Sequence, residues 1–114
     1  MLCRKTKEIF SYIRENPNFT VLIAETIQFE QLLIQNLVRD NVTFISLRNI
    51  VIAKEYRGIG LFKDLVNALE ETNRPILIDD IVNESLFSFF KKRGYVSYEY
   101  IKNNKKIKCM MKRV

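Results

Sequence analysis

Histidine and tryptophan are absent from the 114-residue sequence, and cysteine, proline and glycine occur only two, two and three times. Without histidine, the chain has neither a histidine general base nor a Ser–His–Asp triad. Cys3 and Cys109 lie far apart and form no CxxC pair, so the sequence predicts no metal site. No apolar run approaches the ~18 residues that span a membrane, and the N-terminal residues lack a signal peptide's apolar stretch. We therefore expect a reduced, cytoplasmic protein with no membrane partner.

Hydrophobic residues make up 47% of the sequence, including eight Phe and five Tyr, which is enough for a packed core. The length suits one domain, residues 1–114. The net charge is +6, and the excess is uneven: residues 91–114 contain nine Lys or Arg but only one acid, Glu99. Such a basic region can meet nucleic acid, an acidic protein or a phosphorylated cofactor, or it can simply be a solvated surface.

Apolar periodicity and turn residues predict alternating helices and strands. The expected elements are helix 5–16, strand 19–24, helix 27–40, strand 42–53, helix 58–72, strand 76–78, helix 83–94, and a hairpin of strands 96–101 and 107–111 around Asn103-Asn104. Residues 27–40 are ambiguous, because Phe29, Leu33 and Leu37 have helical spacing while Ile27, Phe29 and Gln31 alternate as in a strand. Length and a polar end favour a helix there. This order predicts an α/β (α+β) fold, a mixed sheet flanked by helices.

Residues 56–62, Tyr-Arg-Gly-Ile-Gly-Leu-Phe, leave a predicted strand and open a helix. Glycines let the backbone approach a ligand closely. The first helical N–H groups are unpaired, and with the helix dipole they favour an anion such as pyrophosphate. The spacing matches neither GxGxxG nor GxxxxGK. A tight strand-to-helix turn without a ligand explains the same residues.

Two motifs in this order resemble the GNAT N-acyltransferase superfamily. The segment Arg57-Gly58-Ile59-Gly60-Leu61-Phe62 is similar to its pyrophosphate loop, R/Q-x-x-G-x-G/A, with Phe62 in the last small-residue position. Asn83, Phe90 and Gly94-Tyr95 are similar to a later helix and the turn that follows it. The resemblance covers residues 42–114. The first 41 residues show no match, which implies a truncated N-terminal half.

The resemblance implies acetyl-CoA as co-substrate, an amine acceptor and direct attack on the thioester. Strands 42–53 and 76–79 should splay apart to admit the pantetheine arm, which would pair with the first strand's edge. Asn83 would contact that arm or cap the helix, and Lys63 could meet further phosphate charge. The implied cofactor-binding residues are Val51, Ile52, Ala53, Arg57, Gly58, Ile59, Gly60, Leu61, Phe62, Asn83 and Phe90.

Catalytic groups are less well matched. Many members of the family carry, where this chain has Phe90, a Tyr that protonates the departing thiolate, and Phe cannot donate a proton. Asp79 and Asp80, at a strand end beside the expected cleft, are candidate general bases. Either could instead cap the next helix or pair with an arginine. Cys109 is expected to be a small core residue rather than a nucleophile.

Other functions fit the same sequence. The chain could be a GNAT-like protein that binds a protein partner and has lost catalysis, as Phe90 suggests. It could also be a small nucleic-acid-binding protein, because Tyr98 and Tyr100 lie among the lysines of the C-terminal hairpin. The hairpin is also a candidate edge for a homodimer. The acceptor class, protein or small molecule, stays open.

Overall fold

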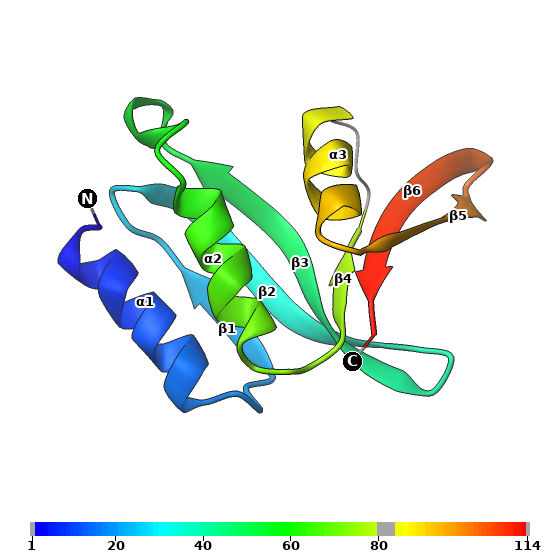
Figure 1. Ribbon diagram of the computed structural model, residues 1–114, viewed down its shortest axis with the longest axis horizontal. Coiled ribbons are helices and arrows are strands. Elements are labelled where there is room, and N and C mark those ends of the chain that lie inside the picture. The colour runs from blue at the N-terminus through cyan, green and yellow to red at the C-terminus, as the bar shows by residue number, and fades with distance from the viewer. Residues whose placement is uncertain (1, 80–83, 114) are drawn as a thin grey trace.

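The computed structural model describes residues 2–79 and 84–113, which contain both helices and strands. In chain order the elements are α1 (Arg4–Glu15), β1 (Val21–Ala24), β2 (Phe29–Arg39), β3 (Val42–Ile52), the short 3₁₀ helix η1 (Lys54–Tyr56), α2 (Leu61–Glu70), β4 (Ile76–Ile78), α3 (Glu84–Lys92), β5 (Val96–Lys102) and β6 (Lys105–Lys112). Within the described residues, six strands form one sheet in the order β1-β2-β3-β4-β6-β5 (Figure 1). Only β3 and β4 pair in parallel. The predicted α/β class, a mixed sheet flanked by helices, is confirmed.

The helices pack on one side of the sheet, which we call the first face (Figure 1). Apolar residues recur along each helix at three- and four-residue spacing, so each helix buries one stripe against the strands. Ile13 of α1, Leu65 of α2 and Phe90 of α3 are fully buried in a single core with Ile34 and Ile45 of the sheet. This core fixes the positions of α2 and α3 above the strands.

The opposite side, which we call the second face, holds a smaller cluster. Phe44, Leu77 and Cys109 are fully buried there, on β3, β4 and β6 respectively. Tyr98 and Tyr100 of β5 pack against them and are half-buried. Cys109 is thus a small core residue, as expected from the sequence.

The predicted helix at residues 27–40 is wrong, because residues 29–39 form strand β2. The residues that suggested a helix do not share a face: Phe29 lies in the core on the first face, whereas Leu37 packs against the cluster on the second face. Phe29 pairs with Ile52 and Gln31 with Val51, so Glu30 is an extra residue in β2. This bulge places the buried residues Phe29 and Leu32 three positions apart on the first face.

Two hairpins turn on residues with positive φ. Asp40 and Asn41 have φ of 51° and 63°, and Asn103 and Asn104 have φ of 52° and 63°. Two-residue turns with this geometry match the twist of antiparallel strands, and Asn and Asp adopt it more readily than most residues. The predicted C-terminal hairpin is confirmed, and the same chemistry at the first turn joins β2 to β3.

Candidate functional site

β3 extends well beyond its parallel neighbour β4. The two strands pair only from Ile45–Ile76 to Leu47–Ile78, whereas β3 continues to Ile52. On the side away from β2, the last residues of β3 therefore have no strand partner among the described residues. Their backbone groups are available to a ligand that lies along this edge.

A second bulge lies where the pairing between β3 and β4 ends. Leu33 pairs with Asn49 and Ile34 with Leu47, so Arg48 is the extra residue of β3. A bulge bends its strand and increases the local twist. The end of β3 is thereby directed away from the line of β4, and a fork opens between the two strands.

A cleft of about 900 Å³ occupies this fork. Ile50 and Ile52 of β3 form one wall, and Leu86 and Phe89 of α3 form the other. Phe62 of α2 closes the end nearest the helix start. Most of the lining is apolar, so the cleft suits an extended, largely uncharged chain.

The loop before α2 places the N-terminus of that helix beside the cleft. Gly60 is the N-cap, with φ of 89° and ψ of 10°, and no side chain caps the helix. Gly58 also has a positive φ of 80°. A Cβ at Gly60 would meet nothing within 4 Å, so the space above the loop is open. The first N–H groups of α2 have no intrahelical acceptor, and the helix dipole places positive charge there.

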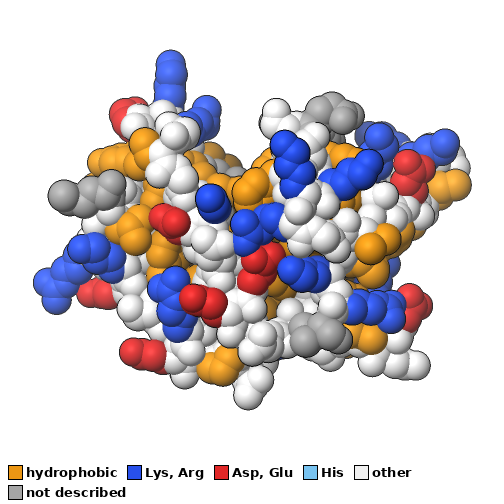
Figure 2. Space-filling model, in the orientation of Figure 1, with side chains coloured by type: hydrophobic (Ala, Val, Ile, Leu, Met, Phe, Trp, Pro, Cys, Tyr) orange, Lys and Arg blue, Asp and Glu red, His pale blue; other side chains and the backbone are white. Residues whose placement is uncertain are grey.

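Basic side chains continue from this loop to α3. A neighbouring groove of about 700 Å³ is lined by Lys63 of α2, by Lys92 and Arg93, and by Ser85 and Phe89, which it shares with the cleft. Figure 2 shows Lys and Arg side chains gathered over α3 and the adjoining hairpin. The charge around the cleft mouth therefore favours an anionic ligand.

The aromatic residues of α3 divide between the cleft and the core. Phe89 lines the cleft, and its ring centroid lies 5.7 Å from that of Phe62. Phe90 is fully buried and packs 4.9 Å from Tyr95. The expectation that Phe90 contacts a cofactor is therefore corrected: its side chain belongs to the core, and Phe89 occupies the cleft wall.

The structure brings only part of the predicted cofactor set together. The predicted residues that line the cleft are Val51, Ile52, Arg57, Gly58 and Phe62. Those with other placements are Ala53 and Leu61, both buried, Ile59, which is 52% exposed, Gly60 at the N-cap of α2, and Phe90 in the core. Asn83 lies outside the described residues. Arg57 Nε donates to the carbonyl of Ile52 at 3.0 Å, which fastens the loop to the end of β3.

Eight further cleft-lining residues are absent from the predicted set: Leu47, Arg48, Asn49, Ile50, Ile78, Ser85, Leu86 and Phe89. The run 42–53 was predicted as one strand, although the polar pair Arg48-Asn49 interrupts its apolar residues at the position of the bulge. Leu86 and Phe89 are three residues apart on α3, as one helix stripe requires, so this spacing was the available signal. The same spacing also fits core packing, so it does not by itself assign Leu86 and Phe89 to a cleft.

Asp79 lies behind the fork, on the second face. Its carboxylate accepts hydrogen bonds from Arg48 Nη1 at 3.1 Å, Tyr100 OH at 3.1 Å and Cys109 Sγ at 3.0 Å. Burial, followed by Asp79, raises the pKa of Tyr100 above its ordinary value. Asp79 thus joins three strands, and the pairing with arginine that the sequence left open is present. Asp80, the other candidate base, lies outside the described residues.

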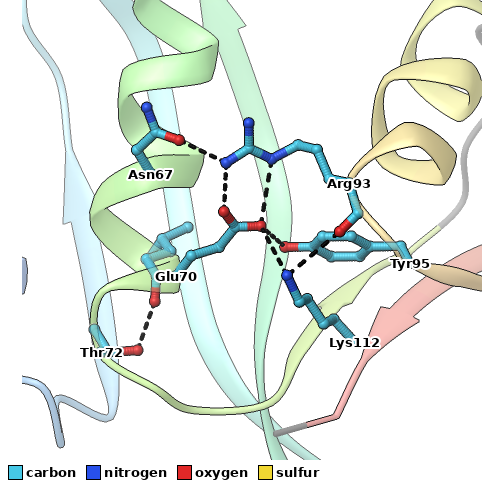
Figure 3. A network of polar contacts seen from close by, with 7 residues as sticks. Asn67, Glu70, Thr72, Arg93, Tyr95 and Lys112 are labelled. Atoms are coloured by element: carbon cyan, nitrogen blue, oxygen red, sulfur yellow. Dashed lines mark hydrogen bonds and ion pairs between the residues drawn. The ribbon is translucent and has the colours of Figure 1, made fainter.

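A polar network fixes the helices that flank the cleft (Figure 3). Glu70 of α2 pairs with Arg93, which follows α3, and accepts a hydrogen bond from Tyr95 OH at 2.9 Å. Lys112 of β6 lies 3.9 Å from the same carboxylate. Arg93 also donates to Asn67 Oδ1. Because these groups come from α2, the end of α3 and β6, they hold the cleft walls at a fixed separation.

The tyrosines of the hairpin do not form an open stacking surface. Tyr98 and Tyr100 are half-buried on the second face, where their rings stack at 6.2 Å. Arg39 lies over the ring of Tyr100 at 4.9 Å. This placement gives little support to base stacking by these residues.

Among residues 2–79 and 84–113, no group of three or more Cys, Asp or Glu side chains could hold a metal ion. In the same part of the chain, no helix has the length and apolar character needed to cross a membrane. Neither the models of known protein families nor the curated proteins with which the sequence was compared give a match.

Proposed function

We propose that the chain is an N-acyltransferase that moves an acetyl group from acetyl-CoA to an amine. One observation carries the proposal: the start of α2, which no side chain caps, adjoins a cleft along the unpaired end of β3, and Gly58 and Phe62 on either side of that helix start line the cleft. This is the arrangement that the resemblance to GNAT proteins leads us to expect. The apolar walls and the basic mouth suit a cofactor with a long neutral arm and a phosphorylated end.

The pyrophosphate would lie at the start of α2. Gly58 and Gly60 have no side chains to obstruct its approach, and the N–H groups of Leu61 and Phe62 come next in the chain. A helix N-terminus carries the equivalent of about half a positive charge. The site therefore needs no cationic side chain in direct contact with phosphate, although Arg57 and Lys63 add favourable charge.

The pantetheine arm would lie along β3 from Ile52 toward Leu47. Its amides can pair with the strand edge that β4 leaves open. The thioester would then reach the fork, near the last β3–β4 pair, Leu47–Ile78. Because the fork separates two strands, the carbonyl carbon is accessible from the second face of the sheet.

The reaction is a direct displacement. The neutral amine adds to the thioester carbonyl carbon, the C–S bond breaks, and the thiolate leaves with the electron pair while the amine nitrogen loses its proton to solvent. No tyrosine is among the described residues that line the cleft. A thiol has a pKa of ~8.5, so its thiolate leaves without an obligatory proton donor. Asp79 is already engaged by three donors, so its role here is to position Arg48.

Thermal unfolding with and without acetyl-CoA tests cofactor binding. A ligand present at 100 times its Kd adds about 2.7 kcal/mol of stability, which raises Tm by several degrees. Gly60→Glu should abolish the rise by adding bulk and negative charge. Gly60→Ala is the matched control, because it carries the same backbone strain but meets nothing within 4 Å, and it should retain most of the rise. No rise at millimolar acetyl-CoA would contradict the proposal.

A second candidate is a GNAT-like binding module without turnover. Three observations favour this second candidate. Phe90 is buried in the core, Asp79 already accepts hydrogen bonds from neighbouring side chains, and no tyrosine is among the described residues that line the cleft. Mass spectrometry of acetyl transfer to a panel of peptides, polyamines and amino acids separates the candidates. Transfer supports the enzyme, and a rise in Tm without transfer to any acceptor supports the module.

A further inference from the structure

The excess positive charge of the chain lies entirely outside its N-terminal third. Residues 1–41 carry five basic and five acidic side chains, so the net charge of +6 belongs to residues 42–114. Residues 91–114 alone contain nine Lys or Arg and one acid, Glu99. Charge concentrated in this way attracts an anionic partner where the side chains share one face of the molecule.

Two lysines of β6 lie on the first face of the sheet. Side chains alternate between the two faces along a strand, and Ile107 and Cys109 belong to the cluster on the second face. Lys106 and Lys108 are therefore on the first face, the side on which α3 packs. The ammonium nitrogen of Lys108 lies 5.9 Å from the ring of Phe87 on α3. This contact places the lysines of the hairpin beside α3.

α3 continues the positive surface from the hairpin to α2. Lys91 follows Phe87 by four residues, so both lie on the side of α3 that faces β6. Lys92 lines the groove of about 700 Å³ together with Lys63 of α2. Figure 2 shows the resulting concentration of basic side chains over α3 and the hairpin. We call Lys63, Lys91, Lys92, Lys106 and Lys108 the lysine band.

The protein itself does not neutralise the lysine band. All five side chains are exposed, and none forms an ion pair with an acid among the described residues. Glu99 lies opposite Lys108 in the register of β5 and β6, and it offsets only part of this charge. Arg93 and Lys112 differ, because both pair with Glu70. The charge of the band therefore faces solvent and is available to a ligand.

The composition of the band indicates the kind of anion that fits it. Lysine is depleted at the centres of protein–protein interfaces, where aromatic residues are enriched. α3 turns its apolar residues toward the core and the cleft, whereas a helix that binds a membrane presents them to the lipid. A phosphate backbone needs only positive charges in a row, and lysines from three adjacent elements supply them.

We propose that the lysine band binds the phosphate backbone of a nucleic acid. Each lysine that contacts a phosphate releases a counterion, so binding is independent of base sequence and falls steeply with salt. Tyr98 and Tyr100 take no part, because their rings stack on the second face. This function goes beyond acyl transfer and does not require acetyl-CoA.

Fluorescence anisotropy of a labelled DNA duplex, and of its separated single strand, tests the band in the absence of acetyl-CoA. If all five lysines contact phosphates, the logarithm of the binding constant should fall with the logarithm of the NaCl concentration. The expected slope is about −4.5 for the duplex and about −3.5 for the single strand. The form that binds more tightly is the one that the band fits. A duplex of unrelated sequence should bind within about twofold.

Variants show whether the band itself makes the contacts. Lys92→Gln and Lys106→Gln should each weaken binding about 5- to 10-fold near 0.1 M salt and make the slope shallower by about 1. Lys7→Gln is the matched control, since it removes one exposed charge from α1, at the opposite end of the molecule from the hairpin (Figure 1). It should change neither quantity. All three variants should keep the wild-type Tm, because the substituted side chains are exposed.

Three results would overturn the proposal. The first is no change in anisotropy at about 100 µM protein in low salt, where non-specific binding is measurable. The second is that Lys7→Gln weakens binding as much as Lys92→Gln, which would mean that net charge alone drives it. The third is tighter binding to a polyglutamate peptide, or to vesicles of anionic phospholipid, than to either nucleic acid at the same salt. None of these results changes the expected Tm rise with acetyl-CoA, so the two proposals fail separately.

Discussion

Glu70 and Arg93 form an ion pair that joins the C-terminal end of α2 to the turn after α3. The pair lies behind the cleft, and both side chains are about four-fifths buried. Burial alone would raise the pKa of Glu70, but hydrogen bonds from Arg93 and Tyr95 bring it below its ordinary value. The carboxylate is therefore more stable in the folded protein than in the unfolded chain.

Glu70→Gln should lower the free energy of unfolding by about 3 kcal/mol at pH 7, because it leaves Arg93 without its charge partner. A depressed carboxylate pKa contributes stability above the unfolded-state value of 4.5, and that contribution is lost as pH falls through the lower folded-state value. Urea unfolding at pH 7 and pH 3 should show the difference between variant and wild type shrinking in acid. An equal difference at both pH values would contradict the ionic explanation.

Truncation of Phe89 and truncation of Phe90 should have different main effects. Phe90→Ala should cost about 3–5 kcal/mol of stability, because it empties a fully buried site. Phe89→Ala should cost less, since that side chain is half-buried, yet it should weaken acetyl-CoA binding by removing a cleft wall. Paired measurements of Tm and of its rise with acetyl-CoA check both. The assignment fails if Phe89→Ala leaves the rise intact.

Asn41→Gly should stabilise the protein by about 0.5–1 kcal/mol, because glycine adopts the positive φ of this turn without strain. Asn41→Ala should destabilise it by about 1 kcal/mol, for the opposite reason. Thermal unfolding of the two variants measures the sign directly. A loss of stability in Asn41→Gly would contradict the assigned turn geometry.

Cys3 should react with iodoacetamide at lower pH than an ordinary thiol. A hydrogen bond with Thr6 Oγ1 at 3.1 Å is the main cause of its lowered pKa, aided by backbone N–H groups at the start of α1. The alkylation rate as a function of pH gives the midpoint. Cys109 is the internal control, because it is fully buried and should react only after unfolding. A midpoint at or above 9.0 would exclude this environment.

Local chemistry explains why much of the fold was predictable. Asn103-Asn104 has a composition that favours one turn type, and Phe62, Leu65 and Leu69 repeat at helical spacing within α2. These signals depend on neighbours in sequence. The bulges at Glu30 and Arg48 depend instead on how β2 and β3 align, although the polar pair Arg48-Asn49 interrupts the apolar run at the second one. Because β2 carries apolar residues on both faces, its sequence resembled a helix, and the bulge at Arg48 lies at the fork.

The candidate site was predictable to the same extent. The loop before α2 could be predicted because its backbone has positive φ at two positions, and glycine, the residue that adopts this conformation most readily, occupies both, as Gly58 and Gly60. Phe89 and Phe90 are adjacent, and a rotation of about 100° around the helix decides which one faces the cleft.

The position of β6 has a consequence for how the chain folds. β6 comes last in the sequence yet lies between β4 and β5, so it alone connects the hairpin to the rest of the sheet. The β1–β3 meander can assemble from local contacts, whereas β4 acquires its second neighbour only when residues 110–112 arrive. The fork that frames the cleft should therefore be among the last parts of the molecule to become rigid.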